Sequence, residues 1–365
     1  PPTCGLEINF RRIKDNPRIK VLTLAHVEKV DGTPGNYDVT IKLAPRYVNE
    51  NCTCCGDCAE ASQTEIDSEF DFGMQKVNGA YLPFEMAFPA RFVISPEIIG
   101  SDDAQRCKDA CKYDAVDFEM EAKTLNFNVG SIVWATGWEP YDATKIDNLG
   151  FGQYPNIITN MMMERLASPN GPTKGKIVRP SDDKAPESIA FVQCAGSRDE
   201  NHLPYCSYIC CMASLKQATY VRERYPDAKI YVFYIDLRTP GLRYERFYEQ
   251  IKKDENIFLI KGKVAEVSED PTNKNISVVA ENAVTGEKIH QTVEMVVLAT
   301  GMQPTTATTK LPADLTYNDD GFIINDFETG GMFAAGCANK PADVVSSNQN
   351  ATGMALKAIQ TLVNR

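Results

Sequence analysis

The chain has 365 residues, of which 43% are hydrophobic and 24% charged, and its formal net charge is −11 at pH 7. This length is enough for two or three domains, and the acidic balance argues against a basic nucleic-acid-binding surface. No run of 18 apolar residues predicts a membrane-spanning helix.

The N-terminal part predicts strands followed by a segment of different character. Residues 19–43 form two or three strands around the turn "DGTPGN". Residues 46–125 are rich in cysteine and proline and show little helical periodicity. The stretch "LNFNVGSIVWATGWEPYD" then predicts one buried strand that ends in Ala-Thr-Gly.

The rest of the chain alternates strands with helices. A buried strand at 188–197 is followed by a helix over about 207–224, the strand "AKIYVFYIDLR" and a helix over about 243–253. The strands "IFLIKGKVAEVSE", "ISVVAENAV" and "EMVVLATGMQP" come next, and the last ends in a second Ala-Thr-Gly. The C-terminal stretch predicts a strand, a glycine-rich turn and a helix. This order favours an α/β fold with parallel sheets.

The two Ala-Thr-Gly strand ends indicate a flavoprotein with two dinucleotide-type domains. Their glycines permit close approach of a dinucleotide to the backbone, although one such tripeptide alone is equally an ordinary strand end. The candidate cofactor-binding residues are Ala135, Thr136, Gly137, Thr300, Gly301, Gly336, Cys337, Val344 and Val345. His26 and Val27 are candidates for the adenine end, with an ordinary strand position as the alternative for His26.

Glycine fingerprints for a dinucleotide are missing. No G-x-G-x-x-G follows a predicted strand, and we expect the first such turn to lie upstream of Pro1. In the second domain the corresponding turn reads "FVQCAGSRDE", with a cysteine and an arginine where a nicotinamide cofactor requires glycines. We therefore expect a nucleotide-type fold that does not bind NAD(P)H.

Ten of the 12 cysteines fall in three clusters, which favours metal binding over disulfides. Iron–sulfur, zinc and unligated thiols all remain open. The run "NCTCCGDCAEAS" has the C-x2-C-x2-C spacing of a bacterial ferredoxin, with Ser62 in the place of the fourth cysteine. In two-cluster ferredoxins the last cysteine of one run ligates the other cluster. The predicted ligand set is Cys52, Cys55, Cys58 and Cys111.

Two other cysteines of this region have no ligand role in that set. Cys107 is left alone at the second ferredoxin-type site, where we expect no cluster, and Cys54 is an extra thiol. Lys112 replaces the proline that usually follows the last ferredoxin cysteine.

A second candidate set consists of Cys194, Cys206, Cys210 and Cys211. If residues 206–224 are helical, Cys206 and Cys210 lie on one face and Cys211 is offset by about 100°. Cys194 ends the neighbouring strand. These thiols suit one cluster near a helix N-terminus, with a redox-active dithiol or buried thiols as alternatives.

The stretch "FVQCAGSRDENHLPYCSYICCMASLKQATYVRERYPDAKIYVFYIDLRTPG" resembles the A subunit of heterodisulfide reductase, and "YVNENCTCCGDCAEA" resembles that family's ferredoxin-like insert. The resemblance covers nearly the whole chain. "PPTCGLEINFRRIKDNPRIK" and "MERLASPNGPTKGKIVRPSD" are similar to the A subunit of the quinone-interacting membrane-bound oxidoreductase (Qmo) of sulfate-reducing bacteria.

This resemblance implies FAD on a thioredoxin-reductase-like fold, and a [4Fe-4S] cluster on the cysteines at 194, 206, 210 and 211. The expected domains are the FAD domain (1–45, 126–185 with a linker, and 301–365), a ferredoxin-like α+β insert (46–125) and a second nucleotide-type domain (186–300). Three scattered histidines form no acid–base motif.

The function that the resemblance implies is electron transfer between menaquinol and adenylylsulfate reductase. The chain would lie in the cytoplasm, held at the membrane by other Qmo subunits that include a membrane subunit. Two alternatives stay open: an NAD(P)H-dependent disulfide reductase of the thioredoxin type, and a non-catalytic assembly subunit.

Overall fold

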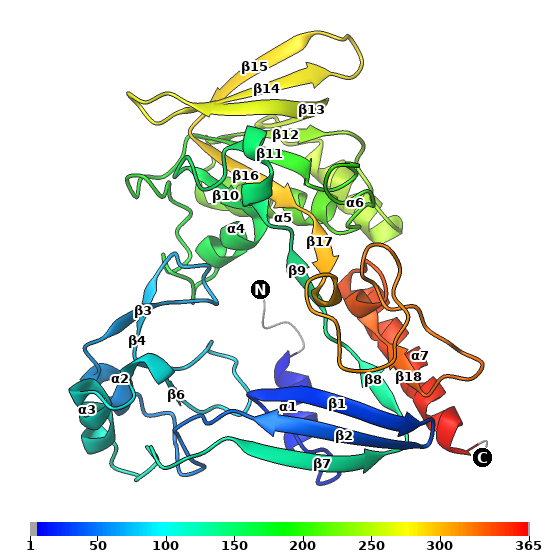
Figure 1. The fold of residues 1–365 in the computed structure, drawn as a ribbon. Coiled ribbons are helices and arrows are strands. Elements are labelled where there is room, and N and C mark those ends of the chain that lie inside the picture. Colours follow the sequence, from blue (N-terminus) through cyan, green and yellow to red (C-terminus); the bar gives the residue numbers. More distant parts are fainter. Residues whose placement is uncertain (1–5, 364–365) are drawn as a thin grey trace. The chain divides into compact units, whose positions relative to one another are not determined.

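The computed structural model describes residues 6–363, so Cys4 lies outside the described residues. The chain divides into two compact units (Figure 1). The first unit runs to Gly32 and includes Tyr37–Asn128; the second contains Thr33–Asn36 and the chain from Val129 onward. Each unit has its own sheets and its own cysteine set.

The first unit combines small sheets with short helices. Its elements are α1 (Leu6–Lys14), β1 (Ala25–Thr33), β2 (Asn36–Leu43), α2 (Asp57–Ala61), β3 (Glu65–Asp67), β4 (Lys76–Asn78), β5 (Ala80–Tyr81), β6 (Val93–Ile94), α3 (Asp102–Ala110) and β7 (Lys123–Val129). The strands β1, β2 and β7 form one sheet, while β3–β4 and β5–β6 are antiparallel pairs. Helix α3 begins where the Ser101 hydroxyl accepts a hydrogen bond from the Ala104 N–H.

The second unit is built on a seven-stranded sheet in the order β10-β16-β11-β12-β13-β14-β15. Its strands are β10 (Ile157–Thr159), β11 (Ser188–Ala195), β12 (Lys229–Tyr234), β13 (Ile257–Glu269), β14 (Ile276–Asn282), β15 (Lys288–Val293) and β16 (Met295–Thr300). The strands from β10 to β13 in this order pair in parallel, whereas β14 and β15 are antiparallel. The predicted α/β class is confirmed.

Helices and a smaller sheet complete the second unit. These elements are β8 (Ile132–Trp134), β9 (Trp138–Pro140), α4 (Asn160–Ala167), α5 (Cys210–Arg224), α6 (Leu242–Ile251), β17 (Met302–Pro304), β18 (Met332–Ala334) and α7 (Val344–Val363). Strand β8 pairs in parallel with β18, and α7 packs beside both of them (Figure 1). Strand β9 follows the first Ala-Thr-Gly and β17 follows the second. These two strands pair antiparallel, so the segments after the two tripeptides are neighbours.

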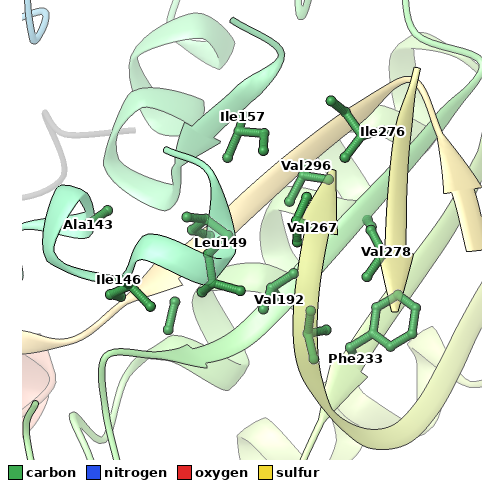
Figure 2. Packing of buried hydrophobic residues seen from close by; sticks show 14 of the residues in the cluster. Ala143, Ile146, Leu149, Ile157, Val192, Phe233, Val267, Ile276, Val278 and Val296 are labelled. Carbon is green, nitrogen blue, oxygen red and sulfur yellow. The ribbon is translucent and has the colours of Figure 1, made fainter. Parts of the chain in front are cut away.

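Continuous apolar runs explain why β11 and β16 lie in the centre of the sheet. All residues of β16 are buried, as are Ile189–Gln193 of β11, which is typical of parallel strands covered on both faces. One face packs against the segment 141–157 and the β13–β15 meander. Figure 2 shows this core, in which Ile146, Leu149 and Phe233 interdigitate with valines of the strands. The opposite face is covered by α4 and α5.

Three sequence expectations need correction. The strand expected through "LNFNVGSIVWATG" is two strands, β7 and β8, interrupted at Gly130-Ser131. Strand β10 belongs to the large sheet, although the sequence places the segment 126–185 in the FAD domain and a linker. The helix expected from 207 begins at Cys210, so Cys206 lies in the preceding loop.

Candidate cysteine sites and the adjoining cavity

The cysteine site of the first unit is a small pocket between the α2 and α3 regions. Cys52 and Cys55 come from the loop before α2, Cys58 from α2 itself and Cys111 from the C-terminal end of α3. Apolar and aromatic side chains complete the lining: Val48, Phe92, Tyr113, Ala115 and Val116. The structure therefore brings together the four cysteines that the ferredoxin spacing selects.

Cys107 points into the apolar core of this unit and does not line the pocket. It is fully buried in a cluster with Ile98 and Ala104. A hydrogen-bonded group fills its polar side: Ser62 Oγ lies 2.8 Å from an Asp103 carboxylate oxygen, which the Thr64 N–H also approaches at 3.0 Å. Protein atoms thus occupy the surroundings of Cys107.

Asp103 holds this group together as a buried carboxylate. Burial alone would raise its pKa, but hydrogen bonds from the Gln63 and Thr64 backbone and from Ser62 hold the pKa well below its usual value. Arg106 adds an ion pair at 2.8 Å. The loop between α2 and β3 is therefore tied to α3 by a charged residue.

The cysteine site of the second unit draws on three separate segments. Cys194 is the penultimate residue of β11, Cys206 lies in the loop before α5, and Cys210 and Cys211 open that helix. The register of β11 against β16 shifts between Val192 and Ala195, and Cys194 adopts a left-handed backbone with φ of 58°. This β-bulge redirects the thiol at the sheet edge into the pocket.

The loop before α5 explains why the helix starts late. Ser207 is the natural N-cap residue here, but its hydroxyl accepts a hydrogen bond from the Met302 N–H at 2.8 Å and contacts the Ser197 hydroxyl at 2.6 Å. Tyr208 has a φ of 69°, which helical residues do not adopt. The helix therefore begins at Cys210, and Ile209 provides no side-chain cap.

Burial raises the pKa of three thiols at this site, those of Cys194, Cys210 and Cys211. The pKa of Cys194 rises to about 11 because of burial and the neighbouring Cys211, while Arg198 opposes the shift. Burial also raises the pKa of Cys210 and of Cys211. A raised pKa keeps these thiols neutral near pH 7, whereas a reactive dithiol needs a lowered pKa.

Both cysteine sets offer thiolate donors, which suit an iron–sulfur cluster and zinc alike. Among the residues that the structure describes, no three His, Cys, Asp or Glu side chains converge closely enough to hold one metal ion. Both four-cysteine sets fit a cluster by their donor chemistry.

A cavity of about 950 Å³ adjoins the second cysteine site. Trp138 of β9, Met302 of β17, Met212 of α5 and Phe247 of α6 give it an apolar wall. Cationic side chains also line it: Lys216, Arg243 and Arg246. Its size and lining are those of a site for a ligand with an aromatic ring system and negative charge. Sequence reasoning missed this cavity because its lining residues come from five separate segments.

The predicted cofactor residues near the first Ala-Thr-Gly include unpartnered polar groups. The Thr136 hydroxyl and the Trp134 indole N–H are buried and have no hydrogen-bond partner among the described residues. Gly137 has a φ of 77°, which favours glycine, and Ala135 is exposed. Buried polar atoms without partners are what a polar ligand site leaves when the protein atoms are considered alone.

The second Ala-Thr-Gly is packed against protein. Thr300 is buried, its hydroxyl donates to Asn160 Oδ1 at 3.0 Å, and its carbonyl accepts from the Cys210 thiol at 3.7 Å. A Cβ on Gly301 would lie 2.5 Å from Ser197 Oγ. Close packing of the chain therefore explains this glycine, and Thr300 and Gly301 gain no support as cofactor ligands.

The remaining predicted cofactor residues lie in different settings. Gly336 and Cys337 precede α7, and the Gly336 N–H donates to Asn350 Oδ1 at 2.7 Å. Val344 lines the cavity and has 77% of its surface exposed. The next residue, Val345, is also exposed. His26 and Val27 lie on β1 of the first unit, where His26 is exposed.

Asp343 directly precedes α7 and caps the N-terminus of this helix. Its carboxylate accepts from the Ser346 N–H at 2.8 Å and from the Tyr244 hydroxyl at 3.1 Å. Burial opposes ionisation, yet these bonds lower its pKa. The helix N-terminus therefore already holds an anionic cap.

Comparison with known proteins identifies relatives of this chain. One of the A subunits of the CoB–CoM heterodisulfide reductase of Methanopyrus kandleri, named an iron-sulfur subunit, is 39% identical over 371 residues, which cover 98% of this chain. The corresponding iron-sulfur subunit from Methanocaldococcus jannaschii is 35% identical over 96% of this chain. Over almost its whole length, the chain is homologous to the A subunits of heterodisulfide reductases.

This heterodisulfide reductase A homologue spans about half the length of the curated relatives, 56% of each of those two. The A subunit of the ferredoxin/F420H2-dependent CoB–CoM heterodisulfide reductase of Methanosarcina acetivorans is 34% identical, and the match covers 46% of its length. All three relatives are components of oxidoreductases by name. The comparisons bear out the family but not the closer likeness to Qmo.

Other comparisons add less. No protein-family model matches the chain. Thioredoxin reductase of Lactococcus lactis is 15% identical and covers 79% of this chain and 86% of its own, with a TM-score of 0.44. None of the helices in residues 6–363 has the length and apolarity that crossing a bilayer requires.

Proposed function

We propose that this chain is an electron-transfer subunit that binds FAD and two [4Fe-4S] clusters within a heterodisulfide reductase-like complex. The observation that carries the proposal is the convergence of four thiols, from three segments of the second unit, on one pocket next to a large apolar and cationic cavity. A flavin exchanges electron pairs and a cluster single electrons, so a protein that holds both can couple two kinds of redox partner.

The residues divide between the proposed groups. One cluster would be held by Cys52, Cys55, Cys58 and Cys111, and the other by Cys194, Cys206, Cys210 and Cys211. The flavin would lie in the cavity of the second unit, which Val344 lines. The unpartnered Thr136 hydroxyl supports a polar ligand near the first Ala-Thr-Gly.

The side chains around the proposed cofactors would set their polarity and charge, and they form no acid–base motif. Trp138, Met212 and Phe247 give the cavity an apolar wall, and Arg243 and Arg246 provide positive charge. At the cysteine pocket, Arg198 pairs with Asp236, and both line it together with Arg238. Positive side chains next to thiolates offset the negative charge that a Cys4 cluster carries.

For the whole complex we propose the Qmo role, in which electrons pass between menaquinol in the membrane and adenylylsulfate reductase. The N-terminal stretch "PPTCGLEINFRRIKDNPRIK" supports this choice by its resemblance to the Qmo protein. Quinol chemistry then requires a membrane partner, through which this chain would associate peripherally with the membrane.

Reduction by NAD(P)H is disfavoured by the turn after β11. Cys194 at the end of that strand lines the cysteine pocket, and Arg198 has a left-handed backbone with φ of 56°. In a nicotinamide site this turn approaches the pyrophosphate through glycines. Here the turn serves the cysteine pocket instead.

Anaerobic purification followed by absorption and electron paramagnetic resonance (EPR) spectroscopy tests the proposal. We expect flavin bands, a broad absorption near about 400 nm and EPR signals of two clusters after reduction. Cys107→Ala is the matched control, because Cys107 lies in an apolar core outside both cysteine pockets, and should keep both signals. Flavin without iron would favour a reductase of the thioredoxin type, and the absence of both would favour a role in assembly.

A further inference from the structure

Tyr208 is the residue that the second cysteine pocket and the large cavity have in common. It lines the pocket with Cys206 and Cys210, and it lines the cavity with Trp138 and Met302. We infer that Tyr208 is a positioning residue whose ring forms the wall between the cluster and the flavin and provides the contact through which electrons cross. This inference rests on the proposed function.

The backbone of Tyr208 is held in an unfavourable conformation. Its φ of 69° lies in the left-handed region, which a bulky aromatic residue rarely adopts. Such a conformation persists only where the surroundings impose it, and it is commonest at functional sites. An asparagine or glycine would meet the same backbone requirement with less strain, so the ring itself needs an explanation.

Neighbouring hydrogen bonds impose this conformation. Ser207, on one side, is fixed by the Met302 N–H at 2.8 Å and by Ser197 at 2.6 Å. The Ile209 N–H donates to the Ser207 carbonyl at 2.8 Å. The Tyr208 N–H is thereby aimed at Cys206 Sγ, 3.4 Å away. A hydrogen bond to a ligand sulfur is one of the levers that set a cluster's reduction potential.

The ring complements that backbone contact. Tyr208 is half-buried and occupies the position between the two sites. When one electron passes from the reduced flavin to the oxidised cluster, the flavin loses it and the cluster gains one negative charge, with no other reactant. A ring at this wall replaces solvent along the route and keeps water from the cluster, both of which affect such a transfer.

Two substitutions separate the ring from the backbone. Tyr208→Gly keeps the N–H that faces Cys206, relieves the left-handed strain and removes only the ring. Tyr208→Phe keeps the ring without its hydroxyl. Phe72→Gly is the matched control, because Phe72 is another aromatic residue with a left-handed backbone, at φ of 54°, and lies in the first unit outside both pockets.

The test uses the holoprotein and measures iron and flavin content, the potential of the second cluster by EPR-monitored titration, and the rate of cluster reduction by the photoreduced flavin in single-turnover experiments. We expect all variants to keep iron and flavin. Tyr208→Gly should slow cluster reduction by roughly tenfold or more. It should also shift the potential to more positive values, because water stabilises the more negative reduced cluster. Tyr208→Phe and Phe72→Gly should match the wild type.

Three outcomes overturn the inference. An unchanged rate and potential in Tyr208→Gly would show that the ring is not required. Loss of iron in Tyr208→Gly would assign the residue to cluster assembly instead. Wild-type protein without iron or flavin would overturn the proposed function itself and this inference with it, whereas the first two outcomes leave the proposed function standing.

Discussion

The two cysteine sites reach similar donor sets by different routes. In the first unit, three of the four cysteines lie within seven consecutive residues, Cys52–Cys58, and the fourth ends a nearby helix. In the second unit, a strand end, a loop and a helix start each contribute, and the sheet brings them together. The first site can be recognised from the spacing of its cysteines along the sequence, whereas the second forms only when the tertiary structure brings distant segments together.

The largest effect should come from breaking the second site. Cys210 is buried at the start of α5, lines the pocket and contacts the Thr300 carbonyl of β16, so Cys210→Ala would remove one of the proposed ligands. We expect loss of one cluster's iron with flavin retained, and no transfer from a quinol analogue to adenylylsulfate reductase in the reconstituted complex. Undiminished transfer with the complex intact would remove this site from the electron path.

A paired substitution sharpens the assignment of the first site. Cys111→Ser should lower the iron content by one cluster, because a hydroxyl is a poor replacement for a thiolate ligand. Cys107→Ala should leave iron unchanged, since Cys107 lies in the apolar core outside the pocket. Iron analysis of both proteins, reconstituted side by side, provides the measurement. Equal losses would contradict the ligand set.

Asp103 offers a smaller effect, on stability. Asp103→Asn weakens hydrogen bonds to a buried charge and should lower the free energy of unfolding of the first unit by about 2 kcal/mol. The native pKa of Asp103 lies below its unfolded value of 3.8. Its contribution is therefore complete above that value and is lost as the pH falls toward the lower native pKa.

Thermal unfolding at pH 7 and at about pH 3.5 measures this. The wild type should lose more stability than Asp103→Asn between the two pH values. A parallel decline in both proteins would mean that the carboxylate does not carry the acid sensitivity.

The smallest expected effect is the reduction of the flavin by nicotinamide nucleotides. Anaerobic NADH or NADPH should leave the flavin absorption essentially unchanged, because Cys194 and Arg198 occupy the turn where glycines would admit a pyrophosphate. Rapid bleaching of the flavin would restore the thioredoxin-reductase alternative.

The contrast between the sites also explains what could be predicted from the sequence. The strands β11, β12 and β16 and the cysteine sets followed from apolar runs and spacing. The late start of α5 did not, because Ser207 looks like a helix cap and only its bond to the Met302 N–H, far along the chain, diverts it. Tyr208 gave no sequence signal, since its left-handed backbone is imposed by the same distant contact.

The central claim is that two separate four-cysteine sites each hold a cluster. The most direct test of this claim is the number of iron atoms per chain. Anaerobic wild-type protein should contain about eight irons per chain, and Cys111→Ser and Cys210→Ala should each retain about four, with the EPR signal of the other cluster intact. About four irons in the wild type, lost altogether in one variant and kept in the other, would contradict the account by leaving one of the two pockets without a cluster.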